Sequence, residues 1–214
     1  MVDRPIELAP HATLYVNHRD VLLRYASENE PVSTIARKLY FLAPSAAFAG
    51  RYERQLALYE TICEKFGTPL SAIRLVGSAH TGFSLVKDTP FDSALSDLDI
   101  AIVDSRLYLS LFEEAFVLTN QWRDVSKFSS GQSANGIRDS FLHYLRRGII
   151  RPDLLPASPR KAEWTNFFGR LSDKYTHFCK GITAGVYASE TFMAVKQESA
   201  IEKFLAKNLP NDQI

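Results

Sequence analysis

"SDLDIAIVD", residues 96–104, has the apolar run of a buried β-strand, with two aspartates near its start. Side chains two residues apart on a strand point to the same face. Asp97 and Asp99 therefore project together, and Leu98, Ile100 and Ile102 point to the opposite face. Two neighbouring carboxylates repel each other and are costly to desolvate. A divalent cation held by oxygen ligands, Mg²⁺ or Mn²⁺, would make such a pair stable; the alternative is a strand that begins at a solvent-exposed edge.

The composition is that of an ordinary globular protein. The chain has 214 residues, of which 46% are apolar and 23% charged, with a net charge of +1. This charge argues against a general affinity for nucleic acid, although it does not exclude a local basic patch. No apolar run is long enough to span a membrane, and the N-terminal residues lack the pattern of a secretory signal. We therefore expect a cytoplasmic protein, with Cys63 and Cys179 reduced.

Strand and helix patterns alternate along the chain. Helices are predicted at residues 11–27, 45–66, 106–118, 136–147, 161–171 and 189–208, and strands at 72–76, 96–103 and 181–188. The helix over 45–66 is expected to start at Ser45, to end at Gly67 and to bury Phe48, Tyr52, Leu56, Tyr59, Cys63 and Phe66. We predict an α/β (α+β) fold with a small mixed β-sheet flanked by helices. The expected single domain, 1–214, has an N-terminal helical part (1–67) and a sheet-containing core (68–214).

A second short motif precedes the aspartates. "RLVGSAHTGF", residues 74–83, reads as a strand that stops at Gly77 and Ser78. Glycine lets a backbone approach a ligand closely, and the following amides and the serine hydroxyl suit a phosphate. A plain turn is the alternative, because Gly-Ser pairs are common.

The order of these motifs resembles the DNA polymerase β-like nucleotidyltransferase superfamily. Its signature is an apolar residue, Gly, Gly or Ser, a gap, and an apolar-alternating Asp-x-Asp, matched here by Val76, Gly77, Ser78, Asp97, Leu98, Asp99 and Ile100. A weaker similarity covers residues 185–204, where a strand leads into a serine-started helix. The gap of residues 79–96 is longer than most members show. Residues 84–96 are expected to form a loop over the nucleotide cleft.

The resemblance implies a Mg²⁺- or Mn²⁺-dependent enzyme. It would transfer a nucleotide from an NTP or dNTP to a hydroxyl of RNA, protein or a growing oligonucleotide. Asp97 and Asp99 would hold the metal, and Gly77 and Ser78 would bind the triphosphate. His80 and Lys87 are further phosphate-binding candidates; the alternatives are a turn histidine and an exposed lysine.

Members of this superfamily usually carry a third catalytic carboxylate on a later neighbouring strand. No apolar-Asp-apolar strand follows Val103 in this sequence. Glu190, after the last predicted strand, is our choice for this role, and the other candidates are Asp124, Asp153 and Asp173. An acidic residue in the first turn of a helix also suits the helix dipole, which is the alternative for Glu190.

The partners follow from size and from one basic cluster. Arg146, Arg147 and Arg151 are candidates for binding an RNA or DNA acceptor, or else they complement a helix C-terminus; Tyr187 is a candidate for base stacking or for the core. The chain looks like compact bacterial nucleotidyltransferases of toxin–antitoxin and antiphage defence operons, which suggests a protein partner from the same operon. The alternative is a catalytically silent subunit that binds nucleotide or protein. A weaker option is an RNA-binding accessory protein.

Overall fold

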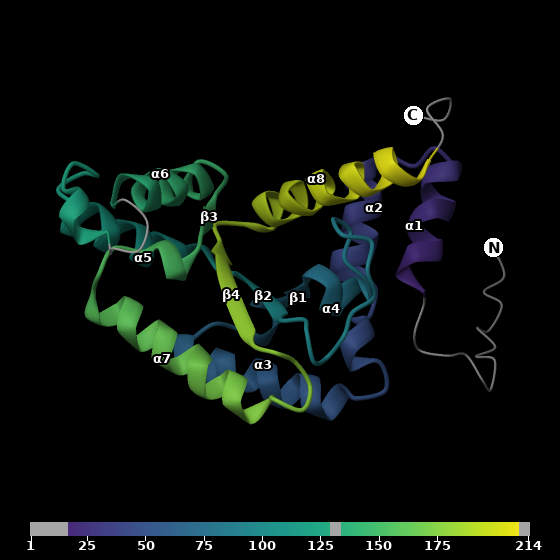
Figure 1. Cartoon of the computed structure of the whole chain (residues 1–214), viewed down its shortest axis with the longest axis horizontal. Helices are drawn as coiled ribbons and strands as arrows, with labels where there is room; N and C mark the ends of the chain where they lie inside the picture. Colours follow the sequence, from purple (N-terminus) through teal and green to yellow (C-terminus); the bar gives the residue numbers. More distant parts are fainter. Residues whose placement is uncertain (1–16, 129–133, 210–214) are drawn as a thin grey trace, which may run out of the picture.

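A four-stranded mixed β-sheet forms the centre of the computed structural model, which describes residues 17–128 and 134–209. The strands are β1 (Ile73–Val76), β2 (Leu98–Val103), β3 (Ile149–Ile150) and β4 (Ile182–Tyr187), arranged in the order β1-β2-β4-β3. β2 is antiparallel to β1 and parallel to β4, and β3 is antiparallel to β4 (Figure 1). The predicted mixed α/β architecture is confirmed at this level. β3 was not predicted, because it lies in a segment that reads as irregular.

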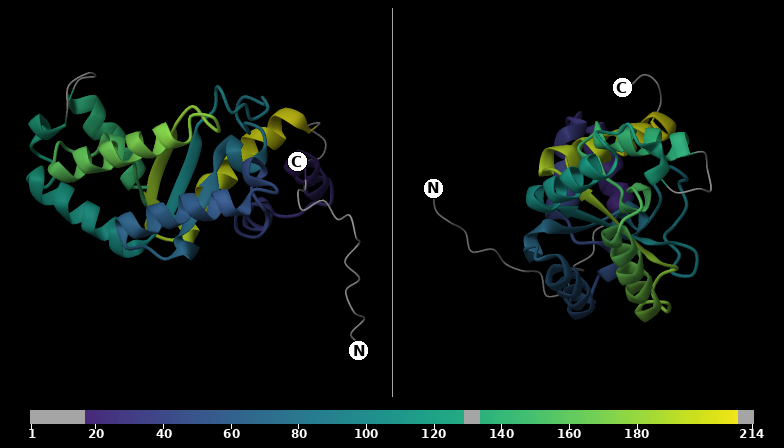
Figure 2. Two further views of the ribbon diagram at one scale, coloured as in Figure 1. Left: turned by 90° about the horizontal axis from the view of Figure 1, so that it is seen from below. Right: turned by 90° about the vertical axis from the view of Figure 1, so that its left-hand side faces the viewer.

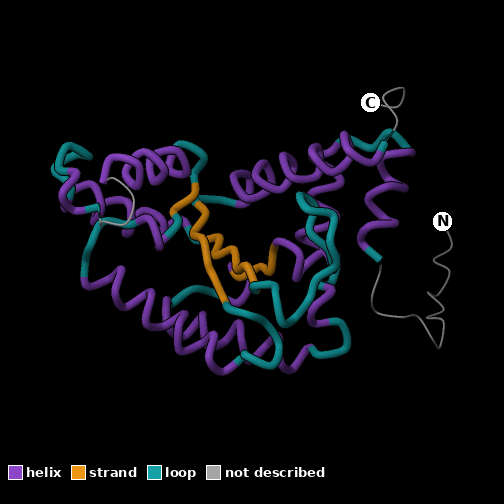
Figure 3. Tube along the Cα trace, in the orientation of Figure 1, coloured by secondary structure: helices purple, strands orange, loops and turns teal. Residues whose placement is uncertain are grey.

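Helices surround this sheet (Figures 1 and 3). The α-helices are α1 (His18–Ser27), α2 (Val32–Arg37), α3 (Tyr52–Phe66), α4 (Gly77–Thr81), α5 (Ser105–Leu118), α6 (Ala134–Leu145), α7 (Pro159–Lys174) and α8 (Glu190–Asn208). Shorter helical turns are η1 (Lys38–Leu42), η2 (Ala46–Phe48), η3 (Leu70–Ala72), η4 (Val125–Lys127) and η5 (Pro152–Leu154). Helices were predicted near α1, α5, α6, α7 and α8, whereas α2 was missed. Residues 11–16 of the first predicted helix lie outside the described residues.

The predicted helix over 45–66 is wrong in its first turns. The chain forms the short turn η2, and then Gly50 takes a left-handed conformation with φ +68° before α3 begins. The side chains of Tyr52 and Leu56 are 42% and 44% exposed, whereas Leu58 and Ile62 are buried. The apolar stripe therefore belongs to two separate elements. Gly67 ends α3 in the left-handed conformation, as predicted.

The two faces of the sheet have different covers. On one face Leu98, Ile100 and Ile102 pack with side chains of α3, α5 and α7. The other face packs with α8 and, beyond it, with the N-terminal helices α1 and α2 (Figure 2). Asp97 and Asp99 belong to this second face, because strand residues alternate. α8 crosses the second face only in part, and this leaves room for a cavity beside the aspartates.

None of the helices within residues 17–128 and 134–209 has both the length and the apolar character needed to cross a membrane.

Candidate functional site

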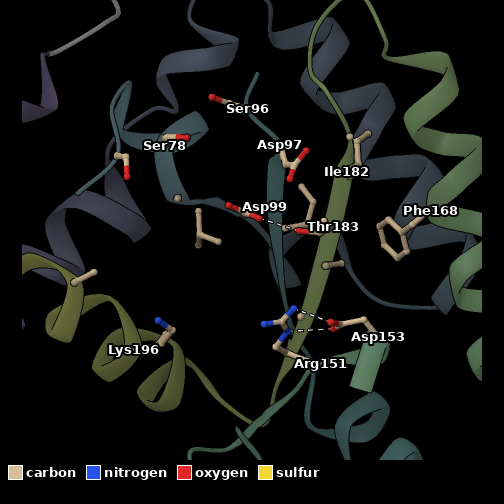
Figure 4. Close-up of a pocket in the computed structure, with 18 of the residues that line it drawn as sticks. Ser78, Ser96, Asp97, Asp99, Arg151, Asp153, Phe168, Ile182, Thr183 and Lys196 are labelled. Carbon is tan, nitrogen blue, oxygen red and sulfur yellow. Dashed lines mark hydrogen bonds and ion pairs between the residues drawn. The ribbon is translucent and has the colours of Figure 1, made fainter. Parts of the chain in front are cut away.

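A cavity of about 1020 Å³ opens beside the start of β2 (Figure 4). Its walls come from the β1–α4 turn, the 84–96 loop, the start of β2, β3 with the chain after it, β4, and the helices α7 and α8, together with Tyr40 of η1 and Tyr144 of α6. Asp97, Asp99, Gly77, Ser78 and Lys87 all line it. The structure therefore brings together most of the site residues that the sequence predicted, from segments that are separate along the chain.

Asp97 and Asp99 face this cavity together, while Leu98 between them is buried on the opposite face of the sheet. Burial is the main cause that raises the pKa of the Asp99 carboxyl group, and the neighbouring Asp97 carboxylate raises it further. The Thr183 hydroxyl donates a hydrogen bond of 2.8 Å to Asp99 Oδ1 and opposes this rise. Burial and the neighbouring Asp97 carboxylate therefore disfavour the ionised form of Asp99, as the spacing of the two aspartates predicted.

Gly77 lies directly against Asp99. Its backbone has φ +65°, and a Cβ atom added there would lie 2.5 Å from Asp99 Oδ2. Val76, the preceding residue, pairs with Asp99 across the antiparallel β1–β2 register. Only glycine satisfies both the left-handed conformation and the close contact. The glycine of the Gly-Ser motif is thus required by the carboxylate that it faces.

Three basic side chains line the same cavity. Lys87 comes from the 84–96 loop, Arg151 follows β3, and Lys196 lies on α8 (Figure 4). The charges of Arg151 and Lys196 act on Asp99 by lowering its pKa. Arg151 also donates two hydrogen bonds to the Asp153 carboxylate, at 3.1 and 2.7 Å. Lys196 was not predicted as a site residue, because the sequence of a helix does not indicate whether a given lysine lines a cavity or faces solvent.

The 84–96 loop borders the cavity, as expected, and is tied to distant segments. Its Asp88 forms an ion pair with Arg19 of α1. The Arg19 guanidinium also lies over the rings of Phe83 and Phe204, at 5.5 and 5.2 Å from their centroids. These contacts hold the loop against α1 and α8. They fix the backbone from which the cavity-facing side chains of the loop project.

Several predicted site residues lie elsewhere. His80 is 4% exposed, stacks with His18 and Tyr40, and bonds through Nε2 to the Leu39 carbonyl at 2.7 Å. Burial lowers the pKa of His80 to about 4. A neutral histidine packed in this cluster does not face the cavity, so its proposed phosphate contact is absent from the structure.

Glu190 is exposed and is not part of the described cavity lining, so the structure does not bring it to the two aspartates. Asp124 and Asp173 also lie outside that lining, whereas Asp153 lines the cavity and forms an ion pair with Arg151. Of the predicted basic cluster, Arg151 lines the cavity, whereas Arg146 and Arg147 do not. Tyr187 is 7% exposed and packs in the core at the edge of the cavity.

Thr183 occupies the strand position beside Asp99. β4 is the parallel neighbour of β2, and its register pairs Asp99 with Thr183. Thr183 was not predicted as a site residue, because a threonine in a strand pattern gives no signal of a site. Thr183 supplies a hydroxyl to the cavity and donates it to Asp99.

The donor set suits one oxygen-ligated cation. Three carboxylates line the cavity, those of Asp97, Asp99 and the Arg151-paired Asp153, and no group of three or more acidic, histidine or cysteine side chains that could hold a metal ion occurs in residues 17–128 and 134–209. Mg²⁺ is commonly bound by one or two carboxylates, with water and substrate phosphates completing its shell. Asp97 and Asp99 are therefore suited to one Mg²⁺ ion whose other ligands are water or phosphate oxygens.

No protein family, curated protein or solved structure matches this chain.

Proposed function

We propose that this protein binds an NTP or dNTP with Mg²⁺ or Mn²⁺ and transfers its nucleotide to an acceptor hydroxyl. The observation that carries the proposal is the contact between the two motifs. Gly77 packs against Asp99 closely enough to exclude a side chain, and both aspartates face the cavity that Ser78 also lines. Two carboxylates next to a glycine-serine turn and three cations are suited to a triphosphate and its metal.

The chain's own residues have separate roles in this proposal. Asp97 and Asp99 hold the cation, which supplies charge neutralisation for the phosphates when it is bound. Ser78 offers a hydroxyl to the phosphates, and Lys87 of the 84–96 loop and Lys196 of α8 bring positive charge to the cavity. Thr183 keeps Asp99 oriented and favours its ionised form. In phosphoryl and nucleotidyl transfer, positioning and electrostatic stabilisation supply most of the rate, and this cavity provides both.

A second candidate is a catalytically silent protein that binds nucleotide. The observation that favours it is Thr183, which stands where a neighbouring strand would offer a third carboxylate. With fewer acidic ligands the site retains nucleotide binding and loses the second metal that commonly supports such chemistry. Biological roles in antiphage defence or a toxin–antitoxin pair belong to the same proposal and rest on the motif resemblance.

The test of transfer uses α-phosphate-labelled nucleotides. Wild-type protein is incubated with each labelled NTP and dNTP, Mg²⁺ or Mn²⁺, and RNA, DNA or protein acceptors. Label that is incorporated into an acceptor or an oligonucleotide supports the enzyme. Binding of the nucleotide without incorporation favours the silent subunit, and absence of binding contradicts both.

Replacing Lys196 with glutamine is expected to weaken nucleotide binding about tenfold, because one charge-assisted contact to phosphate is lost. Calorimetry with Mn²⁺ and a non-hydrolysable NTP measures the change. Lys203→Gln on the same helix is the matched control, since Lys203 is exposed and lies outside the described cavity lining. Equal binding by both variants would remove Lys196 from the site.

Replacing Thr183 with valine is expected to weaken Mn²⁺ binding by about 10-fold, the range typical for loss of a group that orients a metal ligand. The lost hydroxyl raises the pKa of Asp99 further, so protons compete better and the deficit grows as the pH falls. Thr183→Ser keeps the donor and serves as the control. A deficit that does not depend on pH would contradict this role.

A further inference from the structure

The first part of the 84–96 loop is a short hairpin between Ser84 and Thr89. The Ser84 N–H donates to the Thr89 carbonyl at 2.7 Å, and the Asp88 N–H donates to the Ser84 carbonyl at 2.7 Å. These two bonds close the turn, and the tip of the hairpin carries Lys87 and Asp88. The backbone of the tip is therefore defined by its own hydrogen bonds, and what remains to be fixed is the position of the whole hairpin over the cavity.

The two neighbouring side chains of the tip have different surroundings. Lys87 lines the cavity, whereas Asp88 forms an ion pair with Arg19 of α1. The backbone of Asp88 has φ +59°, a left-handed conformation that is uncommon outside glycine but more frequent for aspartate and asparagine. Because Lys87 and Asp88 share this tight turn, a contact that holds Asp88 also holds the backbone that carries Lys87.

One guanidinium group contacts the hairpin and its surroundings. Arg19 donates to both carboxylate oxygens of Asp88, with 3.3 Å between Nη2 and Oδ2, and its Nη2 also donates to Asn208 Oδ1 at 3.3 Å. The same group lies over the rings of Phe83, which directly precedes the hairpin, and of Phe204 on α8. Arg19 therefore links α1 to the hairpin and to α8 (Figure 1).

We propose that Arg19 is a positioning residue of the nucleotide site, which holds Asp88 and thereby keeps Lys87 at the place from which it binds phosphate. This inference rests on the proposed binding of a triphosphate in the cavity. Arg19 lies outside the described cavity lining, so it acts through the hairpin and not on the nucleotide. A lysine on an unrestrained loop has to be ordered when phosphate binds, and this ordering lowers the affinity. A hairpin that is held beforehand avoids the loss.

A purely structural role for Arg19 predicts a different result. The Arg19 and Asp88 side chains are 37% and 19% exposed, and exposed ion pairs contribute little to folding stability, so the fold is expected to survive their loss. A general loosening of the fold would weaken nucleotide binding whether or not Lys87 is present. Positioning acts only through Lys87, so its loss has no further consequence once that lysine has been removed.

The first experiment is a double-mutant cycle on nucleotide affinity. Calorimetry with Mn²⁺ and a non-hydrolysable NTP compares wild type, Arg19→Gln, Lys87→Gln and the double variant. Arg19→Gln is expected to weaken binding about fivefold, the range for ordering one long side chain. In the Lys87→Gln background the same change is expected to weaken binding by less than about twofold, because the two residues act as a unit.

Two further variants complete the cycle. Arg24→Gln is the matched control, because Arg24 lies on the same helix, is exposed and is outside the described cavity lining; its loss is expected to leave binding unchanged. Asp88→Asn keeps Arg19, tolerates the left-handed backbone and removes only the charge of the partner, so it is expected to weaken binding by less than Arg19→Gln does. Melting curves establish that each variant is folded, and Asp88→Asn takes the place of Arg19→Gln in the cycle if the latter does not fold.

The second experiment measures the restraint without nucleotide. Hydrogen exchange of the Ser84 and Asp88 amides, which bond within the hairpin, is expected to be about fivefold faster in Arg19→Gln than in wild type, because the opening of a segment becomes easier when its outside contacts are lost. Arg24→Gln is expected to exchange these amides at the wild-type rate.

Four results would overturn the proposal. Equal NTP binding by wild type and Arg19→Gln would show that Arg19 does not act on the site, and would leave the proposed function intact. An equal loss of affinity with and without Lys87 would assign Arg19 to the stability of the fold, and unchanged exchange of the hairpin amides would show that Arg19 does not restrain them. If wild type bound no NTP, the proposed function would fail and this inference with it.

Discussion

Replacing Asp99 with asparagine is expected to lower the rate of nucleotide transfer by about 100-fold or more, and to leave the folded protein at least as stable as wild type at pH 7. The rate falls because a preorganised charge that holds the cation is removed. Stability does not fall, because the carbonyl of the introduced amide still accepts the hydrogen bond from Thr183 while the buried charge beside Asp97 disappears. Asp97→Asn is expected to act in the same direction on transfer.

The pH dependence of this stability difference has a definite sign. The pKa of Asp99 is raised above its ordinary value of 3.8 in the folded protein, chiefly by burial. Such a group destabilises the fold above its raised pKa and has no effect below its ordinary pKa. The gain in stability of Asp99→Asn over wild type is therefore expected at pH 7. It should shrink as the pH falls through the raised pKa of Asp99 towards 3.8. Urea titrations at a series of pH values measure it.

Asp139→Asn on α6 is the control for both measurements. Asp139 is exposed, pairs with the adjacent Arg138, and lies outside the described cavity lining. Its replacement is expected to change stability by less than about 0.5 kcal/mol and to leave transfer unchanged. An Asp99→Asn variant that kept the wild-type rate would place the chemistry away from this carboxylate.

Replacing Gly77 with alanine is expected to cost more stability than the same change at Gly50. Both glycines have left-handed backbones, with φ +65° and +68°, but an added Cβ meets Asp99 Oδ2 at 2.5 Å at Gly77 and nothing within 4 Å at Gly50. The conformation alone costs about 1–2 kcal/mol for an alanine. The contact with Asp99 adds about 1–3 kcal/mol, as overpacking does. Chemical denaturation of the two variants measures the difference.

The same contact predicts a loss of function that Gly50→Ala does not share. Asp99 is held by Thr183, so it can give way to a new Cβ only by leaving that hydrogen bond and its cavity-facing position. Mn²⁺ binding is expected to fall more than tenfold in Gly77→Ala and to stay unchanged in Gly50→Ala. In an Asp99→Ala background, Gly77→Ala should cost no more than Gly50→Ala does, because the clashing atom is gone. If Gly77→Ala and Gly50→Ala lost the same stability in the wild-type background, the contact between the added Cβ and Asp99 would not be destabilising.

Much of the carboxylate site follows from local sequence patterns. The two-residue period of a strand indicates that Asp97 and Asp99 share a face, and the structure has both on one cavity. The Gly-Ser pair at the end of β1 indicates a turn, and the structure has Gly77 in the left-handed region there. Both depend on a few consecutive residues, which is why sequence is sufficient for them. The helix over 45–66 failed for the converse reason, because its apolar spacing ran through Gly50, which ends one element before the next begins.

Other residues of the cavity lining could not be predicted from local sequence patterns. Thr183 and Lys196 have no local signal. Thr183 contacts Asp99 because β4 pairs with β2, and Lys196 lines the same cavity because α8 packs beside β2. His80 shows the reverse case, because its position after Gly-Ser suggested a phosphate contact and the packing of α1 and η1 buried it instead.

By itself, the sequence determined the alternation of strands and helices, the common face of the two aspartates, and the glycine turn before them. The tertiary structure alone decided that Thr183 is the strand neighbour of Asp99, that Lys196 lines the same cavity, and that Pro152 stands in the register position where β3 would have covered Ala184. The physical reason is the range of the interactions. Backbone periodicity and glycine conformation act within a few residues, whereas strand register and helix packing are fixed by burying apolar surface between segments that are far apart in the chain.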